Sequence, residues 1–185
     1  PAPTPAPTPA PTPAPTPAPI PGPFQVLRPG SLAPGILSGN SISFKRSTYA
    51  ATKTACWAVP EPNGGVSLSL SDDSHQEVPF SAGFAFPFFG KHYESVFVGS
   101  NGYLTFGEGD TRNSGSASTH SRMLRISGLF TNLVPDTESS IKYLQTADTF
   151  AVIYHNMKHF GSTNERSSFW ITLRRSGQVT LSYGE

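Results

Sequence analysis

The stretch SVFVGSNGYLTFG, residues 95–107, predicts the fold of this chain more directly than any other part. Apolar residues alternate with others on both sides of Asn101-Gly102, which is the pattern of two short strands. An Asn-Gly pair readily takes the two positive φ values of a type I′ turn. We therefore predict a β-hairpin over residues 95–107 that turns at Asn101-Gly102.

Short strand patterns continue on both sides of this hairpin. Just upstream, VPFSAGFAFPFFG (residues 78–90) is dense in phenylalanine, and Pro87 restricts this strand to a sheet edge or a bulge. The other segments expected to form strands are 41–49, 54–59, 66–70, 125–133 as one buried strand, 141–144 and 150–156, with 169–173 and 178–183 as a last hairpin. Eight to ten short strands and no convincing amphipathic helix predict an all-β antiparallel sandwich.

The N-terminus has a different character. Residues 1–19 read PAPTPAPTPAPTPAPTPAP, in which every second residue is proline. Proline lacks an N–H and fixes φ, so this repeat favours a polyproline II rod of roughly 60 Å. Threonines four apart in a helix of about three residues per turn spiral around all sides of the rod. We divide the chain into a rod (1–23), an extended arm (24–35) and a β-sandwich domain (36–185).

Composition narrows the class of protein. The formal net charge is +1 and only 14% of residues are charged, which argues against a nucleic-acid binder or a binder of anionic membranes. No apolar stretch is long enough to span a bilayer. The chain begins without an initiator methionine or a signal peptide, so we expect a mature form or a fragment. Cys56 is the single cysteine and forms no internal disulfide.

The residues that could carry chemistry do not form a recognisable catalytic set. His75, His92, His120, His155 and His159 lie in different segments, and we expect no zinc pair at His155 and His159, which straddle a strand end. Two interpretations of Cys56 remain open: a small buried residue beside Trp57, or a thiol that pairs with another molecule or outside this fragment. We expect no enzyme activity and no cofactor.

Loop acids and aromatic residues allow further alternatives. Glu108, Asp110, Asp136 and Glu138 could supply oxygen ligands for calcium, but their spacing matches no EF-hand, so solvated carboxylates are favoured over a metal site. Trp57, Tyr93, Tyr103 and Trp170 could form a sugar-binding platform if exposed, but alternating strand positions favour core packing. No Asn-x-Ser/Thr sequon occurs, so any glycosylation is O-linked.

Three separated blocks resemble a known domain. They are FAFPFFGKHYESVFVGSNGYLTFG (84–107), RISGLFTNL (125–133) and SFWITLRRSGQVTLSYG (168–184). In this order they resemble the nidogen-like β-sandwich of secreted and matrix proteins, closest to the version in bacterial and algal surface proteins. Relatives often carry acidic residues after the Leu-Phe pair, where this chain has Thr131 and Asn132. The resemblance implies an extracellular β-sandwich and puts any cation site built on those acids in doubt.

The repeat resembles the hydroxyproline-rich glycoproteins of algal and plant walls and flagellar surfaces. That resemblance implies hydroxylated prolines and covalent O-glycans along the rod, although similar repeats also form bare linkers in secreted bacterial enzymes. The implied sites are Pro1, Pro3, Thr4, Pro5, Pro7, Thr8, Pro9, Pro11, Thr12, Pro13, Pro15, Thr16, Pro17 and Pro19.

Two functions from different classes follow. The first is a structural subunit of an extracellular O-glycosylated fibre or surface coat, in which copies of the chain bind head to tail. In that hypothesis the arm at 20–34, or a strand within 36–59, completes the sheet of the next subunit. The second is a secreted module that binds carbohydrate or protein through the Glu108–Ser121 loop, with the rod as a spacer.

Overall fold

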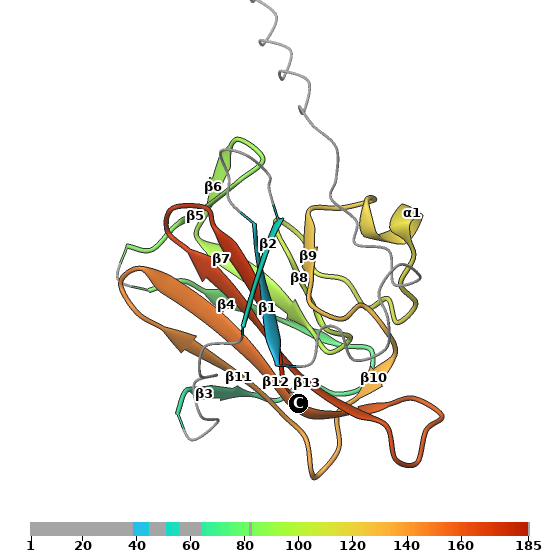
Figure 1. Cartoon of the computed structure of the whole chain (residues 1–185). Coiled ribbons are helices and arrows are strands. Elements are labelled where there is room, and N and C mark those ends of the chain that lie inside the picture. Colours follow the sequence, from blue (N-terminus) through green and yellow to red (C-terminus); the bar gives the residue numbers. More distant parts are fainter. Residues whose placement is uncertain (1–38, 45–50, 56–63, 82, 185) are drawn as a thin grey trace, which may run out of the picture.

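The computed structural model describes residues 39–44, 51–55, 64–81 and 83–184 (Figure 1). The predicted all-β sandwich is confirmed. The described residues contain fourteen strands, more than the eight to ten expected, because several segments are divided by turns. The elements are β1 (Asn40–Phe44), β2 (Ala51–Ala55), β3 (Val66–Leu68), β4 (His75–Pro79), β5 (Phe86–Phe88), β6 (Lys91–Tyr93), β7 (Ser95–Gly99), β8 (Tyr103–Thr105), α1 (Ala117–His120), β9 (Arg125–Ser127), β10 (Leu133–Val134), β11 (Ser140–Gln145), β12 (Thr149–His159), β13 (Arg166–Arg174) and β14 (Val179–Tyr183).

The larger layer is an eight-stranded antiparallel sheet. Its strands lie in the order β2-β1-β14-β13-β12-β11-β3, and β10 also pairs with β12. Alternate residues of the long central strands point to opposite faces. On β12, Phe150, Val152 and Tyr154 point into the core, and their partners Leu173, Ile171 and Phe169 on β13 do the same. The expected hairpins β11–β12 and β13–β14 are both present.

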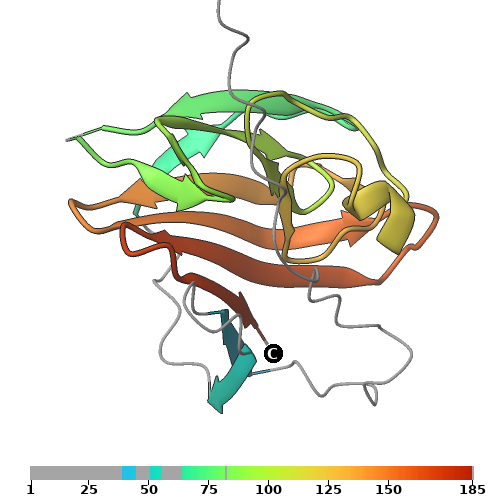
Figure 2. The same ribbon diagram turned by 90° about the horizontal axis from the view of Figure 1, so that it is seen from above.

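The second layer covers one face of this sheet. It consists of the four-stranded sheet β4-β7-β8-β9 and the two-stranded β5–β6 hairpin (Figures 1 and 2). Val78, Val96, Val98, Leu104 and Ile126 bring the apolar face of the four-stranded sheet into the core. Pro87 lies in the two-stranded β5–β6 hairpin, where its missing N–H interrupts no central ladder.

The central hairpin differs from the expected geometry. β7 and β8 pair as predicted, but Gly99 is opposite Tyr103, so the loop has three residues instead of two. Gly102 has a φ of 82°, whereas Asn101 is absent from the residues with positive φ, so the turn is not type I′. A side chain at Gly102 would also collide with the carbonyl oxygen of Leu129. The Asn-Gly pair therefore serves a close approach between the sheets as well as a turn.

Residues 125–133 are not one strand. β9 belongs to the four-stranded sheet and β10 to the eight-stranded sheet. Between them, the N–H groups of Gly128 and Leu129 both donate to the carbonyl of Gly102, at 3.0 and 3.2 Å. The chain changes sheets at this point, which the continuous apolar pattern of the sequence does not reveal.

The N-terminal strands complete the sheet of their own chain. β1 pairs with β14, and β2 pairs with β1. The hydroxyls of Ser41 and Ser182 are 2.7 Å apart, and those of Ser43 and Thr180 are 3.0 Å apart. Within the described residues, β1 and β2 therefore pair in the sheet of their own chain, and donation of a strand from 36–59 to a neighbouring subunit stays a prediction. The rod, the arm, Cys56 and Trp57 lie outside the described residues, and the domain division stays a prediction.

Candidate functional site

The Glu108–Ser121 loop folds over the outer face of the four-stranded sheet (Figure 1). Leu104 and Ile126 point into the core, so the alternate residues of β8 and β9 point outward, toward this loop. The hydroxyl of Thr105 donates to the carbonyl of Glu108 at 2.6 Å. The Tyr103 hydroxyl is 3.0 Å from the carbonyls of both Asp110 and Arg112, and its single proton serves either one. The start of the loop is thereby fixed to β8.

Arg125 forms the centre of this site. Its side chain is 0% exposed and forms an ion pair with Asp110 of the loop. The guanidinium lies between two aromatic rings, 4.4 Å from the centroid of Tyr103 and 4.3 Å from that of Phe130. Nε and Nη1 have no hydrogen-bond partner among the described residues, so the ring faces are their main electrostatic compensation. A buried arginine held in this way fixes the loop to β9.

Two titratable side chains beside Arg125, Tyr103 and His120, have pKa values shifted toward their uncharged forms. Burial, reinforced by the charge of Asp110, raises the pKa of Tyr103 well above its ordinary value of 10, so the phenol stays protonated. Burial and the neighbouring charge of Arg125 lower the pKa of His120, whose Nδ1 lies 3.0 Å from the Ser127 hydroxyl. The ion pairs of the site join Asp110 to the buried Arg125 and to the half-exposed Arg112, whose Nε lies 3.5 Å from Asp110.

A second set of contacts joins the loop to the hairpin between β7 and β8. Asn101 is fully buried, and its Nδ2 donates to Asp73 Oδ1 at 2.8 Å. Its Oδ1 accepts from the backbone N–H of Leu133 at 2.9 Å. The other oxygen of Asp73 accepts from Asn113 Nδ2 in the loop, also at 2.8 Å. Two amides and one carboxylate thus connect the turn before β4, the central hairpin, the loop and β10.

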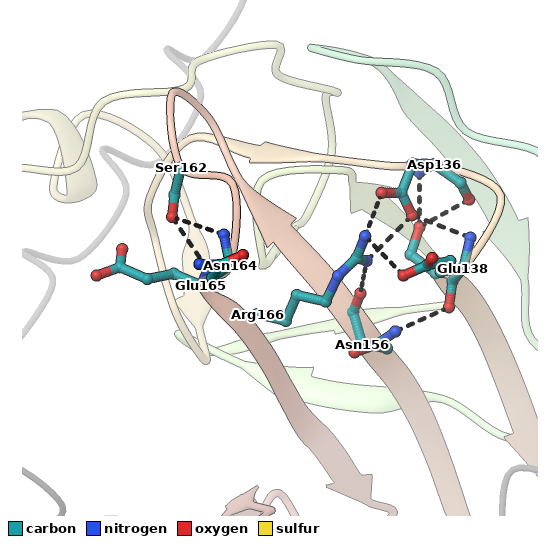
Figure 3. A network of polar contacts seen from close by, with 8 residues as sticks. Asp136, Glu138, Asn156, Ser162, Asn164, Glu165 and Arg166 are labelled. Atoms are coloured by element: carbon teal, nitrogen blue, oxygen red, sulfur yellow. Dashed lines mark hydrogen bonds and ion pairs between the residues drawn. The ribbon is translucent and has the colours of Figure 1, made fainter.

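A separate polar cluster lies on the eight-stranded sheet beside the β12–β13 hairpin (Figure 3). Arg166 donates to both oxygens of Asp136, at 3.2 and 2.6 Å, and to the carbonyl of Asn156 at 2.8 Å. Glu138 lies 3.0 Å from the same guanidinium. Asn156 has a φ of 52° at the bulge between Tyr154 and Met157, a conformation that asparagine tolerates better than most residues.

Three of the four acids considered as calcium ligands pair with arginines, and the fourth, Glu108, is exposed. Asp110 pairs with Arg125, while Asp136 and Glu138 pair with Arg166. The hydrogen bonds from Arg166 lower the pKa of Asp136 from 3.8 to about 2. Within the described residues no three or more His, Cys, Asp or Glu side chains gather as a metal site would require. Asp110 and Asp136 are thus more enclosed than the solvated carboxylates expected from the sequence, whereas the Glu138 side chain is 67% exposed, as expected.

The aromatic residues considered as a sugar platform pack inside the domain where they are described. Tyr103 is 1% exposed and Trp170 is 6% exposed, while Tyr93 packs half-buried against the core. The two spaced histidines, His155 and His159, both lie in β12 and do not straddle its end. His159 Nε2 lies 2.9 Å from the Ser167 hydroxyl.

Sequence reasoning missed the residues that organise the site. Asn101 was assigned only to a turn, and Arg125 and Arg166 were not singled out. An arginine that opens an apolar strand, as Arg125 does in RISGLF, is a usable signal, because burying that cation requires a partner. The partner itself, Asp110, could not be identified from the sequence because nothing in the loop fixes its path.

The model of the NIDO-related family matches residues 48–185, about three quarters of the chain. The chain belongs to the NIDO-related family. Neither the comparison with curated proteins nor that with solved structures found a match. The resemblance of the three sequence blocks to a nidogen-like domain is thereby confirmed, and the family match extends further upstream, to residue 48.

Membership of the NIDO-related family gives the general class of the protein. The domain is typical of extracellular proteins, and the family is one of non-enzymatic modules. None of the helices in the described residues has the length and apolar character to cross a membrane.

Proposed function

We propose that this chain is a structural subunit of an extracellular, O-glycosylated fibre or surface coat, on a cell surface, cell wall or flagellum. The observation that carries the proposal is the PAPT repeat placed ahead of a non-enzymatic extracellular domain. In the described part of that domain, the buried ionic and amide groups tie loops to strands. A domain of this kind suits a rigid unit in an assembly.

The repeat supplies the surface that the proposal assigns to sugar. Its alternating prolines and regularly spaced threonines offer attachment points on every side of an extended rod. Covalent O-glycans would keep soluble a chain in which only 14% of residues are charged. The partners in this proposal are other copies of the chain.

The N-terminal region is assigned as the connector. Because β1 and β2 complete the sheet of their own chain, the proposal uses the residues before Gly39 for contacts with the next copy. A contact between an N-terminal segment and a different surface of the next copy is heterologous, so it propagates into a filament unless the rotation closes a ring.

Intact mass spectrometry and electron microscopy of the native protein test the proposal. Hydroxylation and O-glycosylation predict mass increments of one oxygen per modified proline together with sugar ladders, and micrographs should show filaments or sheets. A mass equal to that of the bare sequence, with only single domains on the grid, would contradict it. A variant with residues 1–35 replaced by a Gly/Ser segment of equal length should fold but no longer assemble.

A second candidate function is a binding module. The observation in its favour is that the Glu108–Ser121 loop is anchored on both sides while Thr111, Ser114 and Ser118 remain exposed. A loop fixed before binding loses little entropy when it binds a ligand. Glycan-array binding by the full chain, abolished by Thr111→Ala with Ser114→Ala but not by Ser176→Ala in the β13–β14 turn, would support this function instead.

A further inference from the structure

One edge of the four-stranded sheet is accessible to solvent. The sheet has the order β4-β7-β8-β9, so β4 pairs with β7 on one side and with no described strand on the other (Figure 1). Val78 of β4 is 2% exposed and points into the core. The remaining residues of the strand are exposed: His75, Gln76, Glu77 and Pro79.

Hydrogen bonds at the two ends of β4 show which backbone groups face β7. The N–H of Ser100 donates to the carbonyl of Ser74 at 2.8 Å, and the N–H of Phe80 donates to the carbonyl of Glu94 at 2.7 Å. In an antiparallel ladder, residues two apart direct their backbone groups to the same side. The even-numbered residues of β4 therefore bond to β7, and the odd-numbered residues face the open edge.

The open edge thus presents a short row of backbone groups. His75 and Glu77 each offer an N–H and a carbonyl, whereas Pro79 offers only a carbonyl because proline has no N–H. No strand in the described part of the chain pairs with these groups. Exposed strand edges of this kind are templates for pairing with another strand.

Neighbouring contacts hold the two odd-numbered side chains in place. The His75 ring packs against that of Phe97, with centroids 5.8 Å apart, and lies over Gly109, where a side chain would collide with it. The hydroxyl of Ser95 donates to Glu77 Oε1 at 2.6 Å. An edge that is ordered before binding loses less entropy when a partner pairs with it.

We propose that this edge is a docking surface for the same edge of a second copy of the chain. The two β4 strands lie antiparallel, with His75 of each copy opposite Glu77 of the other. Each of these pairs then exchanges both of its backbone hydrogen bonds, and the imidazole of one copy lies across from a carboxylate of the other. The contact joins two four-stranded sheets across a twofold axis at Gln76.

The residues of β4 select this register. Displacement toward Pro79 sets Glu77 opposite Glu77, with like charges across the strands, and sets His75 opposite a residue without an N–H. Displacement the other way sets Glu77 opposite Asp73, which has a φ of 48° and so leaves the extended conformation. The edge is therefore complementary to itself in one register, which favours a second copy as the occupant.

This contact is separate from the N-terminal connector of the proposed fibre. It uses only described residues of the folded domain, and it is isologous, so it closes on itself and does not propagate. A contact of a few residues from each copy is small, so we expect a weak dimer that forms at high local concentration.

Disulfide cross-linking tests the register. In a full-length Cys56→Ala chain, Gln76→Cys places two thiols across the twofold axis, with Cα atoms about 4.5 Å apart, which suits a disulfide. Oxidation should convert most of this variant into a covalent dimer on a non-reducing gel. Glu77→Cys is the matched control and should stay mainly monomeric, because its two Cα atoms lie about 9 Å apart. Equal cross-linking of the two variants, or none with Gln76→Cys, would overturn the proposal.

A proline at the edge tests the backbone pairing. Glu77→Pro removes an N–H that β7 does not use, so the full-length variant should fold but lose the dimer. Glu77→Ala keeps the N–H and should still dimerise. Sedimentation velocity at rising protein concentration measures the dimer, and thermal denaturation checks the fold. A wild-type chain that stays monomeric, or a folded Glu77→Pro chain that dimerises like wild type, would contradict the proposal. If Glu77→Pro does not fold, the cross-linking result decides.

Discussion

On the outer face of the four-stranded sheet, a polar loop packs over Tyr103 and is fixed by the buried ion pair of Arg125 with Asp110. On the outer face of the eight-stranded sheet, the buried residues are mainly apolar and centre on Trp170 and Ile153. The first cover comes from residues 108–121, between the two strands that it covers. The short local loop is thus held by directional hydrogen bonds and an ion pair. The apolar residues on the other face are stabilised by non-directional burial, which depends on close packing and not on particular partners.

Removing the buried cation should have the largest effect. Arg125→Ala leaves the nearly buried Asp110 with only the half-exposed Arg112, 3.5 Å away, and removes the group stacked between Tyr103 and Phe130. Breaking one partner of a buried ion pair costs about 3–5 kcal/mol of unfolding free energy. Urea denaturation should show this loss, and Arg122→Ala, at an exposed position near α1, should stay within about 0.5 kcal/mol of wild type. Equal effects would mean that the loop is not held by Arg125.

On the outer face of the eight-stranded sheet, the free energy of unfolding should depend on the size of the side chain at Trp170 and not on its polarity. Trp170→Ala removes a large buried side chain and should cost about 3 kcal/mol, whereas Trp170→Phe should cost about 1 kcal/mol. The smaller second value is expected because phenylalanine keeps most of the buried aromatic area of Trp170. A larger loss for Trp170→Phe in the same denaturation assay would show that an acceptor binds this N–H.

Asn101 links Asp73, and through it the Glu108–Ser121 loop, to Leu133 on β10. Asn101→Ala leaves the buried N–H of Leu133 without its acceptor and should cost about 2 kcal/mol. Asn113→Ala removes a half-buried bond to the same carboxylate of Asp73 and should cost about 1 kcal/mol or less. Similar losses in the two variants would show that the Leu133 contact contributes little.

The strand pairs were predictable from sequence where the contacts are local. The β7–β8 and β13–β14 hairpins follow from the alternation of apolar residues around a glycine turn. The spacing of two between Phe84 and Phe86 places both side chains on one face, and both are buried. The three-residue turn at Asn101 was not predictable, because the close approach of the Leu129 carbonyl to Gly102 is a tertiary constraint.

 The carbonyl of Leu129 reaches Gly102 only because the chain changes sheets after β9, and no residue pattern in 125–133 marks that change. The partners of Arg125 and Arg166 were likewise unpredictable, because they come from loops whose paths depend on the folded sheets.

The Arg166 cluster is expected to give the smallest effect. It is a polar contact at one end of the eight-stranded sheet, whose outer face otherwise buries apolar residues such as Ile153 and Trp170. The folded protein keeps Asp136 ionised down to a pKa of about 2, against 3.8 ordinarily. As the pH falls from about 3.8 to about 2, the unfolded chain takes up this proton first, so the contribution of Asp136 to stability, complete above that window, is lost within it. Asp136→Asn should therefore flatten the acid side of the stability curve measured by thermal denaturation. Asp148→Asn, a matched change in a carboxylate that is 84% exposed and 3.7 Å from Arg175, should leave that slope as it is. If both variants keep the slope of the wild-type chain, the Arg166 pair contributes nothing to stability, and the eight-stranded sheet depends on its apolar contacts alone.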